Sequence, residues 1–379
     1  MKTLKLIKKI TPVIAAGMIA SFAISPVSAA GMLPAVNLKA DEDLLFFPDY
    51  AYVDPRSSLV RIRVHAWAFE PEKDSVKRKA VISLLKKQMG MPADSETAKL
   101  FEDRCMHFMV DQERGKSVAV RIGNDVYNVG MTDASGHTER ALCLPLQMFN
   151  PIVVNNRGGA NEGPVWFDVS TSSRSDPSRV YNAHTRFIPY NGVSVISDID
   201  DTIKISQVAD KKALLENTFI NPYKDVPGMA KLYKKWADQG AEFHYLSASP
   251  WQLYTPISDF MKSAGFPEGI FKMKIFGMSN NFSTLFDGPE KIKTPYLTMV
   301  LKDFPGRTFV LVGDSGEKDP EIYADIARKN PGHVTHIYIR NVSGETRDSA
   351  RMKAAFKGVS DDLWTLFTDT SEIADVNVK

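Results

Sequence analysis

From residue 192 onward, short apolar segments alternate with segments of helical periodicity. The apolar segments lie at 193–197, 242–246, 272–276, 308–312 and 336–340, and the helical ones at 226–239, 257–263, 294–302 and 321–329. Strands that alternate with helices form parallel βαβ units. In such sheets, ligands bind beyond the carboxyl ends of the strands. We therefore predict that residues 192–379 form an α/β domain with a doubly wound parallel sheet.

The preceding segment, 41–190, has a different pattern. Its alternating or apolar runs are separated by clusters of Gly, Asn, Asp and Ser, and lie at 59–66, 117–122, 141–144 and 165–169. This is the pattern of strands and turns. A single segment, 73–87, has helical character. We expect a β-rich domain of the sandwich type that carries one helical insertion.

Residues 1–29 have the features of a secretory signal peptide. Four lysines precede an uncharged apolar run at 10–24, and Val27-Ser28-Ala29 offers small residues for cleavage. The apolar run is shorter than the roughly 20 residues that a membrane-spanning helix needs. We expect cleavage near Ala29 or Ala30 and export to the periplasm or the medium.

Export affects how charge and cysteine content are interpreted. Removing the four lysines of the leader from the 47 basic residues leaves 43, against 45 acidic residues. The mature chain therefore lacks the strongly basic footprint of a nucleic-acid-binding protein. Cys105 and Cys143 either form one disulfide in an oxidising compartment or remain two buried thiols, and neither has a histidine at metal-ligand spacing.

Two acidic clusters follow predicted strands of the α/β domain. The carboxyl ends of parallel strands share one edge, so clusters about 115 residues apart can face one site. Carboxylates this close need a counter-charge, which a hard cation with oxygen ligands supplies. A solvated acidic turn is less common directly after an apolar strand, and the glycine and distal glutamate of a calcium loop are missing. The clusters contain Asp198, Asp200, Asp201, Asp314 and Asp319.

Two further polar residues occupy comparable places, since Ser247 ends the strand at 242–246 and Lys293 precedes the helix at 294–302. Taken in chain order with the acidic clusters, these pieces resemble the four motifs of haloacid-dehalogenase-type phosphatases. The longer runs 197–204, 245–254 and 311–323 resemble the actin-patch-protein family of Mg²⁺-dependent phosphatidate phosphatases. The resemblance is strong over about 195–340 and weaker over 101–145. Ile292 departs from the family pattern, which leaves Lys291 as an alternative to Lys293.

The resemblance implies a Mg²⁺-dependent phosphomonoesterase that forms an aspartyl-phosphate. Asp198 would be the nucleophile. Asp200 would protonate the leaving oxygen and then deprotonate the attacking water. The implied metal ligands are Asp198, the backbone carbonyl of Asp200, and Asp314, with Asp319 behind them, and the implied phosphate ligands are Ser247 and Lys293.

The implied substrate is phosphatidate at a membrane surface, with diacylglycerol as the product. The inserts after Asp200 and Ser247 are too short for a sizeable cap, so we expect an open site. We expect aromatic residues at its rim, namely Trp251, Phe282 and Phe286. They would either contact lipid or pack in the core. The alternatives are an exported phosphatase for soluble phosphomonoesters or phosphoproteins, and a non-catalytic effector whose β-rich domain binds a protein partner. The complete acidic set favours catalysis.

Overall fold

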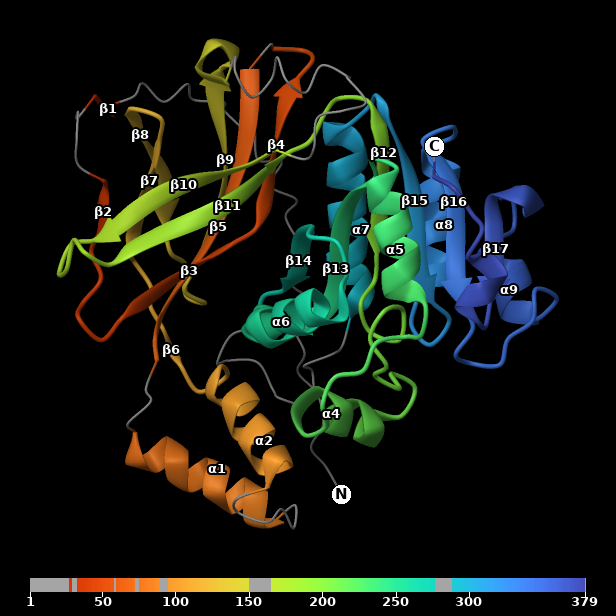
Figure 1. The fold of residues 1–379 in the computed structure, drawn as a ribbon, viewed down its shortest axis with the longest axis horizontal. Helices are drawn as coiled ribbons and strands as arrows, with labels where there is room; N and C mark the ends of the chain where they lie inside the picture. The colour runs from red at the N-terminus through yellow and green to blue at the C-terminus, as the bar shows by residue number, and fades with distance from the viewer. Residues whose placement is uncertain are drawn as a thin grey trace, which may run out of the picture.

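The computed structural model describes residues 27–28, 33–57, 59–71, 75–88, 95–149, 165–276 and 288–378. The signal-peptide prediction, apart from residues 27–28, and the rim candidates Phe282 and Phe286 lie outside these residues. Two sheets lie side by side, and a pair of helices lies below the first of them (Figure 1). Among the described residues, no helix combines the length and the apolar character needed to cross a membrane.

The first sheet contains eleven strands among the described residues, which confirms the prediction of a β-rich region. Its main path is β1-β8-β7-β10-β11-β4-β5-β3, while β2 pairs with β10 and both β6 and β9 pair with β5. All eleven strands are joined into one hydrogen-bonded sheet, so the sandwich form stays a prediction. The strands are β1 (Val27–Ser28), β2 (Ala35–Val36), β3 (Asp43–Phe47), β4 (Asp49–Asp54), β5 (Leu59–Glu70), β6 (Asp111–Gln112), β7 (Ser117–Ile122), β8 (Asp125–Met131), β9 (His137–Pro145), β10 (Val165–Ser173) and β11 (Val180–Phe187).

The helical insertion is a hairpin of two helices, α1 (Val76–Gln88) and α2 (Glu96–Met106). The sequence pattern indicated α1 and missed α2, which begins at a side-chain cap where Ser95 Oγ accepts from the backbone of Ala98 at 3.1 Å. Of the two alternatives for the cysteines, the structure has free thiols rather than a disulfide, but only Cys105 is buried, whereas Cys143 is exposed.

The second sheet is parallel throughout, in the order β14-β13-β12-β15-β16-β17. Every residue of β13 is buried, as expected for a parallel sheet covered on both faces. The predicted strands are all present, and β17 was missed. The strands are β12 (Gly192–Ser197), β13 (Glu242–Pro250), β14 (Ile270–Lys274), β15 (Arg307–Asp314), β16 (Val334–Arg340) and β17 (Trp364–Phe367).

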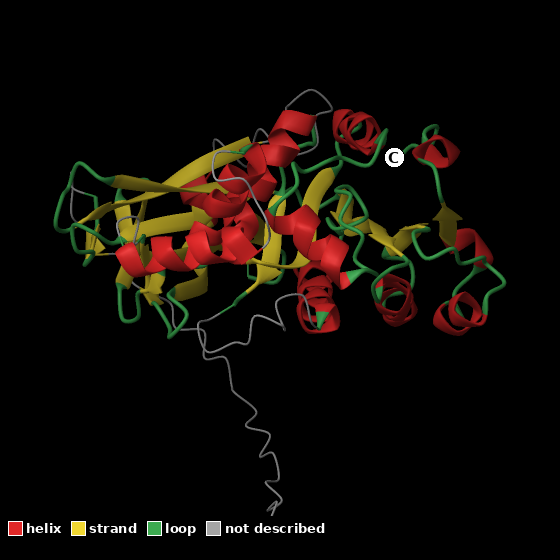
Figure 2. Cartoon of the chain, turned by 90° about the horizontal axis from the view of Figure 1, so that it is seen from below, coloured by secondary structure: helices red, strands yellow, loops and turns green. Residues whose placement is uncertain are grey.

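Helices lie on either side of the parallel strands (Figure 2). On one face α5 packs Tyr233 and Trp236 against the sheet, and on the other α7 and α8 contribute Leu297 and Tyr323. The sequence indicated α5 to α8 and missed α4 and α9. The helices are α4 (Lys211–Phe219), α5 (Met229–Asp238), α6 (Tyr254–Ala264), α7 (Pro289–Asp303), α8 (Asp319–Lys329) and α9 (Ala350–Ala355).

The two sheets are joined by buried polar and aromatic contacts. Asp303, at the end of α7, accepts hydrogen bonds from Tyr50 at 2.8 Å and Tyr52 at 2.6 Å, and pairs with Arg63 at 2.8 Å. The Trp251 ring lies in this interface with 1% of the residue exposed, 4.0 Å from a ring of β3. Of the two roles considered for Trp251, contact with lipid is therefore wrong and packing in the core is confirmed.

Candidate active site

The first acidic loop begins where β12 ends. The backbone of Asp198 continues the sheet by donating to Val312 at 2.8 Å. Asp201 has a φ of 57°, a left-handed conformation that Asp tolerates better than most residues. Its carboxylate accepts from the backbone of Ser206 and Gln207, each at 2.8 Å. Asp201 therefore shapes the loop, and Asp198 and Asp200 are left to face the site.

The second acidic loop joins β15 to α8. Asp314 Oδ1 accepts from the backbone of Gly316 at 2.6 Å and Glu317 at 3.2 Å. Asp319 is the first residue of α8, and its Oδ2 accepts from the Asp314 backbone at 3.3 Å. A side chain at Gly313 would collide with the Asp319 carboxylate. Glycine at this position is thus what allows the two carboxylates to approach one another.

Lys293 connects the two loops. It lies on α7, and its side chain is fully buried. Its Nζ lies 2.8 Å from Asp198 Oδ1, 2.5 Å from Asp319 Oδ1 and 3.1 Å from Glu317 Oε2. Lys291 is exposed. The geometry thus brings Lys293, rather than Lys291, to the acidic edge.

Asp200 lies in a separate polar pocket. Its Oδ1 pairs with Lys204 at 2.7 Å and accepts from Ser206 at 2.7 Å. Its Oδ2 accepts from Ser247 at 3.2 Å and Ser249 at 2.9 Å. Burial raises the pKa of Asp200, but the charge and hydrogen bond of Lys204 and the serine hydroxyls outweigh it and lower the pKa to about 2. The Ser247 hydroxyl, which the resemblance implies as a phosphate ligand, thus donates a hydrogen bond to Asp200 in this structure.

The carboxylates around Lys293 suit a bound metal ion. Asp198, Asp314 and Asp319 each offer an oxygen, and these atoms lie within 4.8 Å of one another. Asp314 Oδ2 is buried and has no hydrogen-bond partner among the described residues. With Glu317 the cluster contains four carboxylates, and three of them, Asp198, Glu317 and Asp319, pair with Lys293. Burial and mutual repulsion raise the pKa of Asp198 and Asp314 well above the usual range, which a divalent cation would relieve.

Sequence reasoning assigned no role to five residues that contact Asp198, Asp200 or Lys293. Thr202 donates to Asp198 Oδ2 at 3.1 Å, and the others are Lys204, Ser206, Ser249 and Glu317. All but Ser206 lie within the runs 197–204, 245–254 and 311–323, so the signal that could have found them was present. Ser206 lies outside those runs, and the loop closure made by Asp201 brings it to the site.

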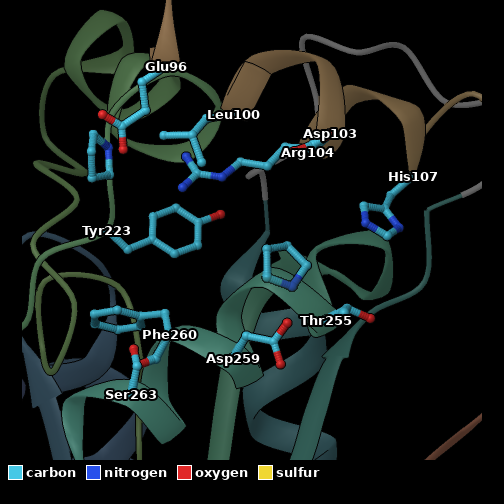
Figure 3. A pocket seen from close by; sticks show the side chains of 12 residues that line it. Glu96, Leu100, Asp103, Arg104, His107, Tyr223, Thr255, Asp259, Phe260 and Ser263 are labelled. Atoms are coloured by element: carbon cyan, nitrogen blue, oxygen red, sulfur yellow. The ribbon is translucent and has the colours of Figure 1, made fainter. Parts of the chain in front are cut away.

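Tyr223 links the helical hairpin to this site. The Arg104 guanidinium, from α2, lies 3.7 Å from the centre of the Tyr223 ring, and the Lys204 ammonium lies 5.0 Å from it. Arg104 and Tyr223 also line a cavity of about 420 Å³ between α2 and α6 (Figure 3). The Tyr223 ring thus contacts Arg104 of the helical hairpin and Lys204 of the first acidic loop, and Lys204 is the ion-pair partner of Asp200.

This part of the chain combines a parallel sheet with a buried acidic edge and a buried lysine. Residues 193–341 match the family model of the catalytic domain of phosphatidate phosphatase APP1. The match falls on the region whose motifs resemble this family, which confirms that resemblance.

Two curated relatives match over the same proportion of the chain. Phosphatidate phosphatase APP1 of Saccharomyces cerevisiae is 34% identical over 189 residues, 48% of this chain and 32% of the yeast protein. An uncharacterized protein of Schizosaccharomyces pombe is 28% identical over 182 residues, 47% of this chain and 30% of the relative. The matched region thus covers about a third of each relative.

Proposed function

We propose that this protein is a Mg²⁺-dependent phosphatidate phosphatase that converts phosphatidate to diacylglycerol through an aspartyl-phosphate. In this proposal the parallel domain is doubly wound and of the haloacid-dehalogenase type. The observation that carries the proposal is the buried carboxylate of Asp198, held between Lys293 and Thr202. Beside it lies Asp314 Oδ2, which has no hydrogen-bond partner in the described part of the chain. A partner-binding effector would not need this arrangement.

Asp198 acts as the nucleophile. One of its carboxylate oxygens bonds to phosphorus as the bond from phosphorus to the diacylglycerol oxygen breaks. Lys293 and Thr202 orient that carboxylate, and Lys293 also offers positive charge to the phosphoryl oxygens. Asp198, Asp314 and the Asp200 carbonyl, with Asp319 beside them, would hold Mg²⁺, which would supply positive charge to neutralise those oxygens.

Asp200 transfers the proton in both steps. In the first step it gives its proton to the diacylglycerol oxygen, and in the second it takes a proton from the water that attacks the aspartyl-phosphate, so the cycle is balanced. Without substrate, Lys204 holds Asp200 as the carboxylate that the second step uses. An anionic phosphate beside it raises its pKa, as any like charge does.

The remaining assignments concern where the enzyme works. We propose residues 1–29 as a signal peptide, 41–190 as the β-rich domain and 192–379 as the phosphatase domain of an exported protein. Its substrate partner is a phospholipid, and nucleic acid has no place in the proposal. N-terminal sequencing of protein from a secreting host should find a start near Ala30, whereas a retained Met1 would contradict export.

The reaction is tested by phosphate release from phosphatidate, lysophosphatidate and soluble phosphomonoesters, with and without Mg²⁺. Asp198→Asn should retain less than about a tenth of wild-type kcat, a barrier increase of at least about 1.4 kcal/mol. Asp238→Asn, on the exposed side of α5, is the matched control and should behave as wild type. Turnover by Asp198→Asn at near the wild-type rate would refute the mechanism.

The acid role of Asp200 has its own signature. Asp200→Asn should lose about 10²–10⁴-fold in kcat on alkyl esters, the usual range for general acid–base help. Nitrophenyl phosphate should lose less, because nitrophenolate leaves without a proton. Equal losses on both esters would argue that Asp200 only shapes the loop.

A further inference from the structure

The loop between Asp314 and α8 is closed by hydrogen bonds to the Asp314 carboxylate. Asp314 Oδ1 accepts from the backbone N–H groups of Gly316 at 2.6 Å and Glu317 at 3.2 Å, so both lone pairs of this oxygen are used. Asp314 Oδ2 is buried and has no hydrogen-bond partner within the described ranges. The backbone of this loop therefore fixes the carboxylate and determines which of its oxygens stays available.

Arg351 holds this backbone from outside the loop. It is the second residue of α9, and its Nη1 donates to the carbonyl oxygen of Ser315 at 2.5 Å, while its Nη2 donates to the carbonyl oxygen of Glu317. The same guanidinium binds both carboxylate oxygens of Glu321, in the first turn of α8, at 2.8 and 3.1 Å. One planar group thus joins the loop to the helix that follows it.

The contact with Ser315 reaches Asp314 through a single peptide group. The carbonyl of Ser315 and the N–H of Gly316 belong to the same planar unit. When Arg351 fixes the carbonyl on one side of that unit, the N–H on the other side is directed at Asp314 Oδ1. The Ser315 hydroxyl is held as well, because it accepts from the backbone of Val342 at 2.9 Å.

We propose that Arg351 is a positioning residue for Asp314, because it fixes the loop so that one carboxylate oxygen stays available to the divalent cation. Removing a group that orients a metal ligand in this way typically weakens metal binding by about 10–100-fold. The inference rests on the proposed function, since the cation is part of it. Arg351 lies beyond residues 193–341, which match the family model, so the catalytic edge would depend on a part of the chain outside the matched region.

Loss of the charge and loss of the bridge have opposite expected effects. Arg351 is positively charged, so its removal would by itself make the acidic cluster more attractive to a cation. Loss of the bridge would release the loop backbone and weaken cation binding. Arg351→Lys keeps the charge, but an ammonium group cannot reproduce the planar fork that joins two carbonyls and a carboxylate. We therefore expect weaker binding in both Arg351→Ala and Arg351→Lys.

The test is calorimetric titration of the full chain with Mg²⁺ alone, in the absence of substrate. Asp314→Asn should lose most of the binding, which assigns the cation to this site. Arg351→Ala and Arg351→Lys should each bind Mg²⁺ about 10–100-fold more weakly than wild type. In phosphate release, the half-saturating Mg²⁺ concentration should rise by a similar factor, while kcat at saturating Mg²⁺ should fall less. If Arg351→Ala does not fold, Arg351→Lys gives the decisive comparison.

Arg347 offers the matched control. It also donates to two backbone carbonyls, those of Trp364 at 3.1 Å and Asp361 at 3.0 Å, and it pairs with the Asp361 carboxylate at 3.3 Å. Neither acidic loop contains these residues. Arg347→Lys should therefore lower the melting temperature about as much as Arg351→Lys does and leave the Mg²⁺ affinity unchanged. Equal weakening of Mg²⁺ binding in the two variants would make Arg351 an ordinary structural residue and overturn the proposal.

Two other results would also overturn it. One is unchanged or tighter Mg²⁺ binding in Arg351→Lys, and the other is a wild-type chain that binds no Mg²⁺ or binds it independently of Asp314. Hydrolysis of phosphatidate with unchanged Mg²⁺ affinity in the Arg351 variants would reject the positioning role and leave the phosphatase assignment intact. Mg²⁺ binding that depends on Arg351, without any hydrolysis of phosphatidate, would do the reverse.

Discussion

Replacing Asp303 with Asn should destabilise the contact between the two sheets. Asp303 is only 9% exposed. Its carboxylate accepts hydrogen bonds from three donors of the β-rich region, Tyr50, Tyr52 and Arg63. The substitution keeps the size of the side chain and one acceptor oxygen. It removes the charge that Arg63, itself only 16% exposed, was buried against.

The expected cost follows from that geometry. Removing one partner of a buried ion pair costs about 3–5 kcal/mol, because the other charge stays buried without compensation. One tyrosine can still donate to the remaining oxygen of Asn, so we expect the lower end, about 3 kcal/mol. For a chain of this size, that corresponds to a fall of roughly 5 °C in melting temperature.

Denaturant unfolding of wild type, Asp303→Asn, Arg63→Met and the double variant measures this. The sum of the stability losses in the two single variants should exceed the loss in the double variant by a coupling energy of about 1–3 kcal/mol. Asp238→Asn removes the charge of a pair that is 68% and 64% exposed, Lys234–Asp238, and should cost less than about 1 kcal/mol. A loss below about 1 kcal/mol in Asp303→Asn, or strictly additive losses, would refute the reasoning.

Three further predictions concern pH, a close contact and Lys204. Burial lowers the pKa of His137 to about 4. The stability that this neutral side chain contributes is therefore present above pH 6.5 and is lost as the pH falls toward 4. Between these pH values, His137→Asn should reduce the slope of the unfolding free energy against pH by up to about 1.4 kcal/mol per pH unit. Gly313→Ala should cost about 1–3 kcal/mol and lower turnover, and an unchanged melting temperature would contradict this. Tyr223→Leu should lower kcat on alkyl esters severalfold through the lost ring beneath Lys204, whereas Tyr223→Phe should keep kcat near wild type.

The parallel domain was predictable from the sequence because its strands are buried on both faces. The segments 193–197 and 308–312 are short, mainly apolar runs between helices, a pattern typical of strands in a covered parallel sheet. Helix α2 was missed because its pattern is mainly polar, and only the face with Phe101 and Cys105 is buried against other elements. In such a helix, tertiary packing rather than periodicity decides the structure.

The edge of the site was predictable for the same reason, since residues that follow parallel strands must gather at one end of the sheet. The direction of each side chain was not, because it depends on loops that close only in the fold. The turn at Asp201 brings the Lys204 ammonium into an ion pair with Asp200 rather than with the other carboxylates. The acidic edge is thereby split into a neutralised pair and a cluster around Lys293 that keeps excess negative charge. In the proposed mechanism, the divalent cation would therefore bind on the side of Asp198, the proposed nucleophile.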